Sequence, residues 1–217
     1  MTDDCTDGDT IAGDFVFSVT MPSSLHSHRH LVRYRIHFED AAGNAATAPY
    51  DDDESPNFAY FIYDGVPAWS GANQPGTTAT ETFPASLMDD MPIYQLVANS
   101  TDVANSQYSS GSDGVHMFGT MVYDGKVYDH IEFENRGEAS TYQSGKNKWR
   151  FHFNRSRDFA ARDQWGKKYN SPWDEMNFDS CASPWAPLHR GMAGLDEAIS
   201  YRLFSLAGMA SPSLHYV

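Results

Sequence analysis

The sequence predicts an α+β chain in which part of an antiparallel β-sandwich precedes a second region of antiparallel strands and one long helix near the C-terminus. Short runs in which apolar and polar residues alternate predict the strands, because this is the period of a half-buried strand. Asp124-Gly125 lies between two such runs and is a strong hairpin signal. Residues 195–207 place their apolar side chains on one stripe at helical spacing, and Gly208 follows where a C-terminal cap belongs.

Composition and charge exclude some classes of function. The 217 residues include 29 acidic and 15 basic side chains, for a net charge of -14, which disfavours a nucleic-acid partner. No apolar run is long enough to span a membrane. The polar, acidic N-terminus does not resemble a signal peptide, so we expect either a protein that is not exported or a piece that lacks its beginning. Cys5 and Cys181 are too few for a disulfide framework or a zinc site, and we expect them to be unpaired or incidental.

The first 65 residues are expected to be strands of a β-sandwich. Residues 14–20 and 31–38 alternate, and a turn signal follows the second run at residues 39–44. Together they resemble the last strands of an immunoglobulin-like or fibronectin-like module, truncated at its N-terminal side.

A connection is expected after this module. The acidic run at residues 51–56 ends in a proline and is interpreted as a solvated linker rather than a calcium loop, because its spacing is not that of an EF-hand. Residues 64–85 are rich in Gly, Pro, Ser, Thr and Asn, as exposed connections are. The predicted organisation is therefore a sandwich part at 1–65, a linker at 66–90 and a second domain at 91–217.

Strands and one loop are predicted from alternation in and near the second domain. The loop is expected at residues 99–114, with at most one helical turn. The helix at 195–207 is expected to be wedged between two layers, because apolar or aromatic residues lie on two of its sides. The predicted strands are residues 58–63, 92–97, 115–123, 127–133 and 148–153.

The most informative stretch joins a strand that ends at Arg136 to a strand that follows Lys146. A small polar loop between them exposes backbone N–H groups beside an ammonium, and this arrangement can cradle phosphates. A basic hairpin with solvated ends is the plainer alternative. The order of strand, turn, lysine and helix is that of a kinase N-lobe, in which Glu197 would hold Lys146 and Asp196 would compete for that role.

Three motifs carry a family resemblance that extends over residues 91–217. They are Arg-Gly-x-x-Ser at 136–140, Lys-x-x-Trp-Arg-Phe-x-Phe at 146–153 and Arg-Leu-Phe-x-Leu-Ala-Gly at 202–208. At these residues the chain resembles the spore coat protein H (CotH) kinase family. The resemblance is to a bacterial subgroup in which the kinase follows immunoglobulin-like modules in large exported proteins.

This resemblance implies a kinase-like N-lobe that binds ATP with a divalent metal such as Mg²⁺ and serves the phosphorylation of protein substrates outside the cell or at its surface. Lys146 would be the nucleotide lysine and Glu197 its helix partner. Arg136, Gly137 and Ser140 would form the loop over the phosphates. The family's catalytic and metal-binding aspartates belong to a later lobe, so the chain is expected to be an inactive N-terminal part. The alternative is a surface binding or adhesion module without catalysis, and nucleotide binding would distinguish the two.

Three other groups of residues were weighed. The alternating His26, His28 and His30 are expected in a solvated hairpin loop rather than at a metal. A basic cluster suits either an acidic or phosphorylated partner or ion pairs with the neighbouring Asp158, Asp163 and Asp174. Trp173 and Trp185 are expected to anchor a long loop to the core. The basic cluster consists of Arg155, Arg157, Arg162, Lys167 and Lys168.

Overall fold

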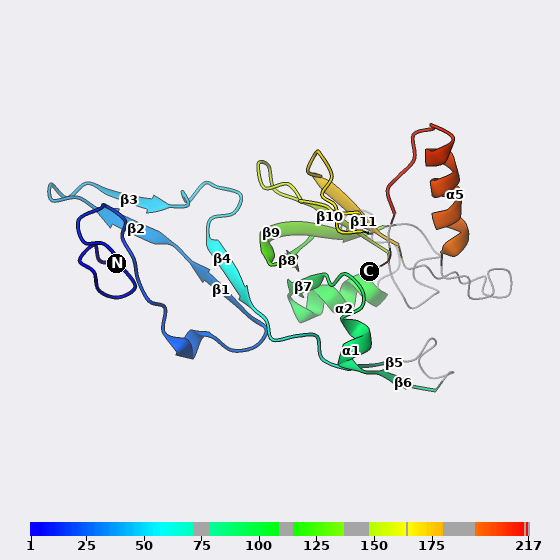
Figure 1. Cartoon of the computed structure of the whole chain (residues 1–217), viewed down its shortest axis with the longest axis horizontal. Coiled ribbons are helices and arrows are strands. Elements are labelled where there is room, and N and C mark those ends of the chain that lie inside the picture. The colour runs from blue at the N-terminus through cyan, green and yellow to red at the C-terminus, as the bar shows by residue number, and fades with distance from the viewer. Residues whose placement is uncertain are drawn as a thin grey trace.

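The computed structural model describes residues 1–71, 79–108, 115–136, 148–163, 165–179, 194–214 and 216. Its strands are antiparallel and its helices few, which confirms the predicted α+β class. The N-terminal strands lie at one end of the molecule and the C-terminal helix at the other, with a large sheet between them (Figure 1).

The N-terminal strands form two separate pairs. β1 (His30–Tyr34) pairs with β4 (Phe58–Ile62), and β2 (Ile36–Glu39) pairs with β3 (Ala45–Ala48). The run at 31–38, predicted as one strand, is therefore divided at Arg35, because its two halves pair with different partners. Asp40 closes the predicted turn after β2 by accepting hydrogen bonds from the N–H groups of Ala42 and Asn44. The packing of these pairs as a sandwich stays a prediction.

The strand predicted at residues 14–20 is wrong. Only Ser18 pairs there, in an isolated bridge with Thr2. The Asp3 carboxylate accepts hydrogen bonds from the backbone N–H groups of Gly13, Asp14 and Phe15, at 2.7, 3.2 and 3.0 Å. A side chain that takes backbone donors in this way competes with strand pairing.

The large sheet is a five-stranded meander whose spatial order is the order of the chain. Figure 1 shows β9 in its middle. The predicted hairpin is confirmed: Asp124 and Gly125, with φ of 51° and 72°, connect β8 to β9 as a two-residue turn with positive φ at both positions. The strands are β7 (Gln95–Ala98), β8 (Met117–Tyr123), β9 (Lys126–Asn135), β10 (Trp149–His152) and β11 (Glu175–Phe178).

The hydrophobic core lies against one face of this sheet. On β10 the predicted alternation is confirmed, because Phe151 and Phe153 are buried in the core with Trp149 against them. Arg150 and His152 point to the opposite face, where both lie near Glu134 and Glu175. Trp173 packs on the core as expected, whereas Trp185 lies outside the described residues. The most deeply buried apolar residues are Met121, Ile131, Phe133, Phe151 and Phe159.

The predicted connection and loop contain regular elements. β5 (Trp69–Gly71) pairs with β6 (Glu81–Phe83), and α1 (Ala85–Met88) follows. A nine-residue helix, α2 (Ser100–Tyr108), forms in the first part of the loop predicted at 99–114, whereas residues 109–114 lie outside the described residues. It begins where the Asn99 side chain accepts the N–H of Thr101 at 2.8 Å, an N-terminal cap that the prediction overlooked.

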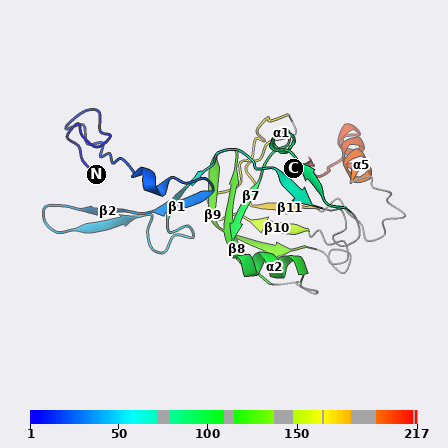
Figure 2. The same cartoon turned by 90° about the horizontal axis from the view of Figure 1, so that it is seen from below.

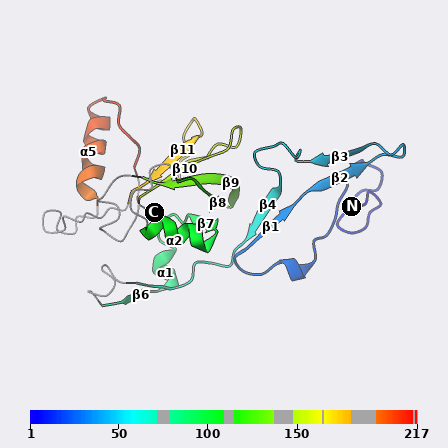
Figure 3. The same ribbon diagram turned by 180° about the vertical axis from the view of Figure 1, so that it is seen from behind.

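The C-terminal helix α5 (Leu195–Leu206) forms as predicted, and Gly208 follows with φ of 77°. Its predicted burial between two layers is wrong, because none of its residues is buried and Leu203 is 59% exposed. In Figures 2 and 3 the helix stands apart from the strands at its end of the molecule. Among the described residues, no helix is long and apolar enough to cross a membrane.

The core predicts a contrast between two phenylalanines of the same sheet. Phe133 has no exposed surface, whereas Phe118 is 62% exposed. We expect Phe133→Ala to lower the free energy of unfolding by about 3–5 kcal/mol, because it leaves a cavity in the core. Phe118→Ala, the control, is expected to change it by less than about 0.5 kcal/mol. Urea unfolding measures both, and equal losses would contradict this placement of the core.

Candidate functional site

The predicted nucleotide site is described only at its edges. Gly137, Ser140 and Lys146 lie outside the described residues. Arg136 and Lys148 border that segment, and the N–H of Arg136 donates to the carbonyl of Lys148 at 2.9 Å. Residues 137–147 therefore connect β9 to β10 where these neighbouring strands end together.

Two of the predicted site residues, Arg136 and Glu197, are described, and both act on Tyr201 of α5. Glu197 is exposed on α5 and accepts a hydrogen bond from the Tyr201 hydroxyl at 3.1 Å. This bond and the charge of Glu197 raise the pKa of Tyr201, while the charge of Arg136 acts in the opposite direction. Arg136, at the end of β9, is thus close enough to α5 to act on Tyr201. The pair of Lys146 with Glu197 stays a prediction.

Sequence reasoning missed two buried polar side chains at this end of the sheet. Asn135 on β9 is 3% exposed, and among the described residues neither its amide nitrogen nor its amide oxygen has a hydrogen-bond partner. Trp149, directly opposite on β10, buries an indole N–H that also has no partner in the described part of the chain. Leaving such groups unsatisfied costs free energy, so they mark a position where a ligand or a water would bind favourably. Asn135 continues the series of Ile131 and Phe133, and a polar residue at that spacing was the available signal.

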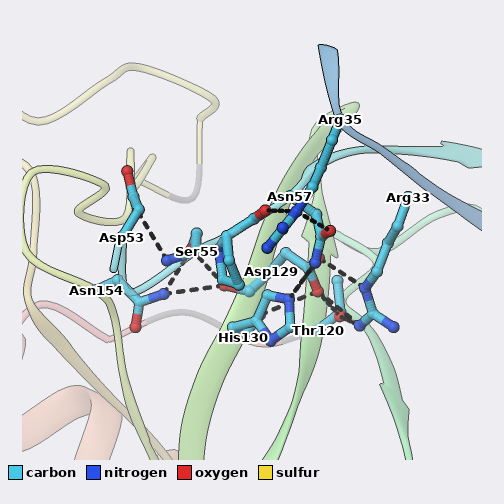
Figure 4. A network of polar contacts seen from close by, with 10 residues as sticks. Arg33, Arg35, Asp53, Ser55, Asn57, Thr120, Asp129, His130 and Asn154 are labelled. Atoms are coloured by element: carbon cyan, nitrogen blue, oxygen red, sulfur yellow. Dashed lines mark hydrogen bonds and ion pairs between the residues drawn. The ribbon is translucent and has the colours of Figure 1, made fainter. Parts of the chain in front are cut away.

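A second polar site, also missed from the sequence, joins the N-terminal strands to the large sheet (Figure 4). Arg33 of β1 donates from Nε and Nη2 to the two carboxylate oxygens of Asp129 on β9, both at 2.8 Å. The Thr120 hydroxyl donates to the same carboxylate and accepts from Arg33 at 3.0 Å. The Asp129 side chain is only 5% exposed, against 43% for Arg33. The contact is a bidentate arginine–carboxylate ion pair, which is stronger than a hydrogen bond between neutral groups.

A β-bulge in the β8–β9 pair orients the Asp129 side chain toward β1. The register shifts between Gly119 and Met121, and His130 has φ of 53°, which is uncommon for a residue other than glycine. The extra residue allows Tyr128 and Ile131 both to reach the core, although strict alternation would place them on opposite faces. Asp129 lies between them and turns toward Arg33.

The partners of Asp129 determine its charge state. Burial raises the pKa of its carboxyl, but the hydrogen bonds from Arg33 and Thr120 and the charge of Arg33 outweigh burial, so the pKa lies below its ordinary value. Asp129 therefore remains ionised in the folded protein at neutral pH. The bond to Asp129 also raises the pKa of Arg33.

The acidic run at 51–56 is solvated at Asp51, Asp52 and Glu54, as expected, but its Ser55 is buried in this site. Ser55 has no exposed surface and donates from its hydroxyl to the Asp129 carbonyl at 3.1 Å. The Asn154 amide donates to Ser55 Oγ at 2.7 Å and to the same carbonyl at 3.1 Å. Asn57 lies 3.1 Å from the His130 ring nitrogen Nε2. Figure 4 shows these contacts continuing from the ion pair toward Asn154. The boundary between the predicted domains is therefore crossed by buried hydrogen bonds.

The other sequence candidates have these surroundings. The His26 ring forms a hydrogen bond with the Tyr60 hydroxyl at 2.9 Å, and the His28 ring accepts one from the N–H of Asp64 at 3.0 Å. Among the described residues, the group whose side chains could hold a metal ion is Asp3, Asp9 and Asp14. Of the basic cluster, Arg162 pairs with Asp124 at 2.6 Å and Arg157 lies 3.6 Å from Asp53. The partners in these two pairs are Asp124 and Asp53, not the neighbouring Asp158, Asp163 or Asp174. Cys5 is free, and Cys181 lies outside the described residues.

Comparison with known proteins leaves the family open. A scan against protein-family models, a search of curated proteins and a search of solved structures each found no match.

The ion pair predicts unequal effects for two arginines close together in the chain. Arg33→Ala leaves a buried carboxylate without its partner, and we expect the free energy of unfolding to fall by about 1–3 kcal/mol. Arg35→Ala is the control, because Arg35 bonds to the Pro56 carbonyl and to Asp51, whose side chain is 83% exposed, and its removal leaves no buried charge unpaired. Exposed pairs contribute at most about 1 kcal/mol. Chemical unfolding compares the two, and a larger loss for Arg35→Ala would contradict the account.

The lowered pKa of Asp129 predicts a pH dependence. A group with a lowered folded pKa stabilises the protein above its unfolded value of about 3.9, and this contribution is lost as pH falls through the folded pKa. The stability difference between the wild type and Asp129→Asn should therefore be large at neutral pH and shrink below about pH 4. Asp51→Asn, at the 83%-exposed position, should give a small difference throughout. Unfolding curves at several pH values test this, and a difference that grows in acid would contradict it.

Proposed function

We propose that the chain contributes the nucleotide-binding N-terminal part of an atypical protein kinase of the CotH type, which transfers phosphate from ATP to protein substrates. The observation that carries the proposal is the proximity of Arg136 to α5, the helix with Glu197. They approach each other at the end of the sheet where residues 137–147, with Lys146, connect β9 to β10. In a kinase N-lobe the nucleotide lysine pairs with a helix glutamate, so Lys146 would need to lie near the helix that carries Glu197.

The described residues at this end are compatible with ATP. The buried Asn135 amide offers a donor and an acceptor and the Trp149 indole offers a donor, and none of these groups has a partner among the residues that the structure describes. Arg136 and Lys146 would hold the phosphates, with Gly137 and Ser140 contributing to the loop. ATP with a divalent metal would supply the phosphoryl group. The proposal includes a location at the cell surface or outside the cell, which the family resemblance implies.

Lys148 is occupied by a different interaction. Its ammonium lies 2.8 Å from Asp179, and the two side chains are 26% and 25% exposed. An ammonium already paired with a carboxylate is a poorer phosphate ligand than an unpaired one. Lys148 therefore has a structural role in the proposal and serves as the control for Lys146.

A second candidate function is non-catalytic binding at a surface. It is favoured by the consecutive exposed residues Phe15, Val16 and Phe17, at 85%, 59% and 57%. Contiguous exposed apolar residues mark interaction sites more often than single ones do. This candidate predicts protein binding without any requirement for nucleotide.

Lys146→Ala tests the kinase proposal. In a protein that carries this chain together with the catalytic lobe, we expect the variant to lose ATP-dependent phosphorylation, because positioning of the phosphates supplies most of such catalysis. In the chain alone, ATP binding measured by calorimetry should weaken by at least about tenfold, the effect of one charge-assisted bond.

The matched control is Lys148→Ala, which should retain ATP binding. If Lys148→Ala abolishes binding and Lys146→Ala does not, the nucleotide lysine has been placed two residues too early. If the wild type binds no ATP, the kinase proposal fails and surface binding is the remaining candidate.

A further inference from the structure

A small cavity opens beside the start of β9, away from the predicted nucleotide site. Its volume is about 260 Å³, and its wall includes Lys126, Tyr128, Asn154, Ser156 and Arg157. Strand residues rise by about 3.3 Å each, so Lys126 lies on the order of 30 Å along β9 from Arg136. The cavity is therefore distinct from the segment that carries Lys146.

Two cations line this cavity in a chain of net charge -14. The Lys126 ammonium lies 4.6 Å from the centroid of the Tyr128 ring, and no carboxylate of the described residues pairs with it within 4.0 Å. The Arg157 guanidinium is 3.6 Å from Asp53, which is longer than a hydrogen bond. Its N–H donors are thus not consumed by that carboxylate.

Asp129 is the acidic residue among the described residues of the wall, and its charge repels a bound anion only weakly. Its side chain is 5% exposed and bound to Arg33. The ion pair with Arg33 offsets the charge of Asp129, so this carboxylate adds little negative charge to the wall. Asp53, at 3.6 Å, offsets part of the charge of Arg157, and Lys126 has no such carboxylate among the described residues.

The wall is held in place by the polar site already described. The Asn154 amide is anchored to Ser55 and to the carbonyl of Asp129. The N–H of Arg157 donates to the Asn154 carbonyl at 2.9 Å, which closes the turn that carries Ser156. A site whose backbone is fixed in advance loses less entropy when it binds.

We propose that this cavity, the Lys126–Arg157 pocket, binds a phosphate group. Two cations match the charge of -1.5 to -2 that a phosphate monoester carries near neutral pH, whereas a carboxylate carries half as much. A guanidinium donates two parallel hydrogen bonds to phosphate oxygens, an ammonium adds a point charge, and the Ser156 hydroxyl supplies a further donor. The phosphate can be free or carried on a phosphorylated side chain, since the chemistry recognised is the same.

Calorimetric titration of the whole chain at constant ionic strength tests the pocket. Inorganic phosphate and O-phosphoserine are the two probes, and acetate is the comparison. We expect saturable binding of at least one phosphate probe, and tighter binding of O-phosphoserine would identify a phosphorylated side chain as the source. Acetate should bind at least about tenfold more weakly, as expected for its smaller charge.

Variants locate the site. Lys126→Ala and Arg157→Ala should each weaken phosphate binding by about tenfold or more, the effect of losing one charge-assisted contact. Lys167→Ala removes an equal charge outside the pocket and should leave binding unchanged. Lys126→Arg should retain binding, and circular dichroism confirms that each variant is folded. Lys146→Ala should also leave binding intact, which separates this pocket from the ATP site.

Three results would overturn the proposal. The first is phosphate binding that does not saturate, and the second is acetate binding as tight as that of phosphate. The third is an equal loss in Lys167→Ala, which would show a general charge effect instead of a pocket.

Discussion

The bond between Arg33 and Asp129 is the constraint on which the arrangement of the described chain depends. It joins residues 96 positions apart and connects β1 to the large sheet. A two-stranded pair such as β1–β4 is at best marginally stable in water without a surface to pack on. β4 lies against β9, and the ion pair fixes β1 beside it. The β1–β4 pair is therefore stabilised by its contacts with the large sheet.

The same bond explains several local features. The bulge and the positive φ of His130 exist at the point where Asp129 must leave the core face. The carbonyl of Asp129 then accepts from both Ser55 and Asn154. Through Asn154 the contacts continue into the wall of the Lys126–Arg157 pocket. A change at Arg33 is thus expected to reach that pocket through hydrogen bonds.

Local signals in the sequence predicted much of the large sheet. The Asp124-Gly125 turn, the alternation after Trp149 and the Gly208 cap each specify backbone conformation within a few residues, and each is confirmed. The predictions failed where a distant or side-chain partner decides the outcome. Asp3 takes the backbone donors of residues 13–15, and different partner strands divide the run at Arg35.

The candidate sites also differ in whether local signals or long-range contacts define them. A loop before a lysine is visible in the sequence, so the segment with Lys146 could be proposed, although it lies outside the described residues. The pairing of Arg33 with Asp129 and the meeting of Lys126 with Arg157 are long-range contacts that no periodicity reveals. Asn135 was the exception, because a polar residue at a core spacing is a local signal.

A double-mutant cycle between Arg33 and Asp129 tests the central claim most directly. The free energy of unfolding is measured for the wild type, Arg33→Ala, Asp129→Ala and the double variant. Direct coupling predicts that the double variant loses less than the sum of the two single losses, with an interaction energy of about 1–3 kcal/mol. Additive losses, within about 0.5 kcal/mol, would show that the bond does not hold the N-terminal strands to the sheet.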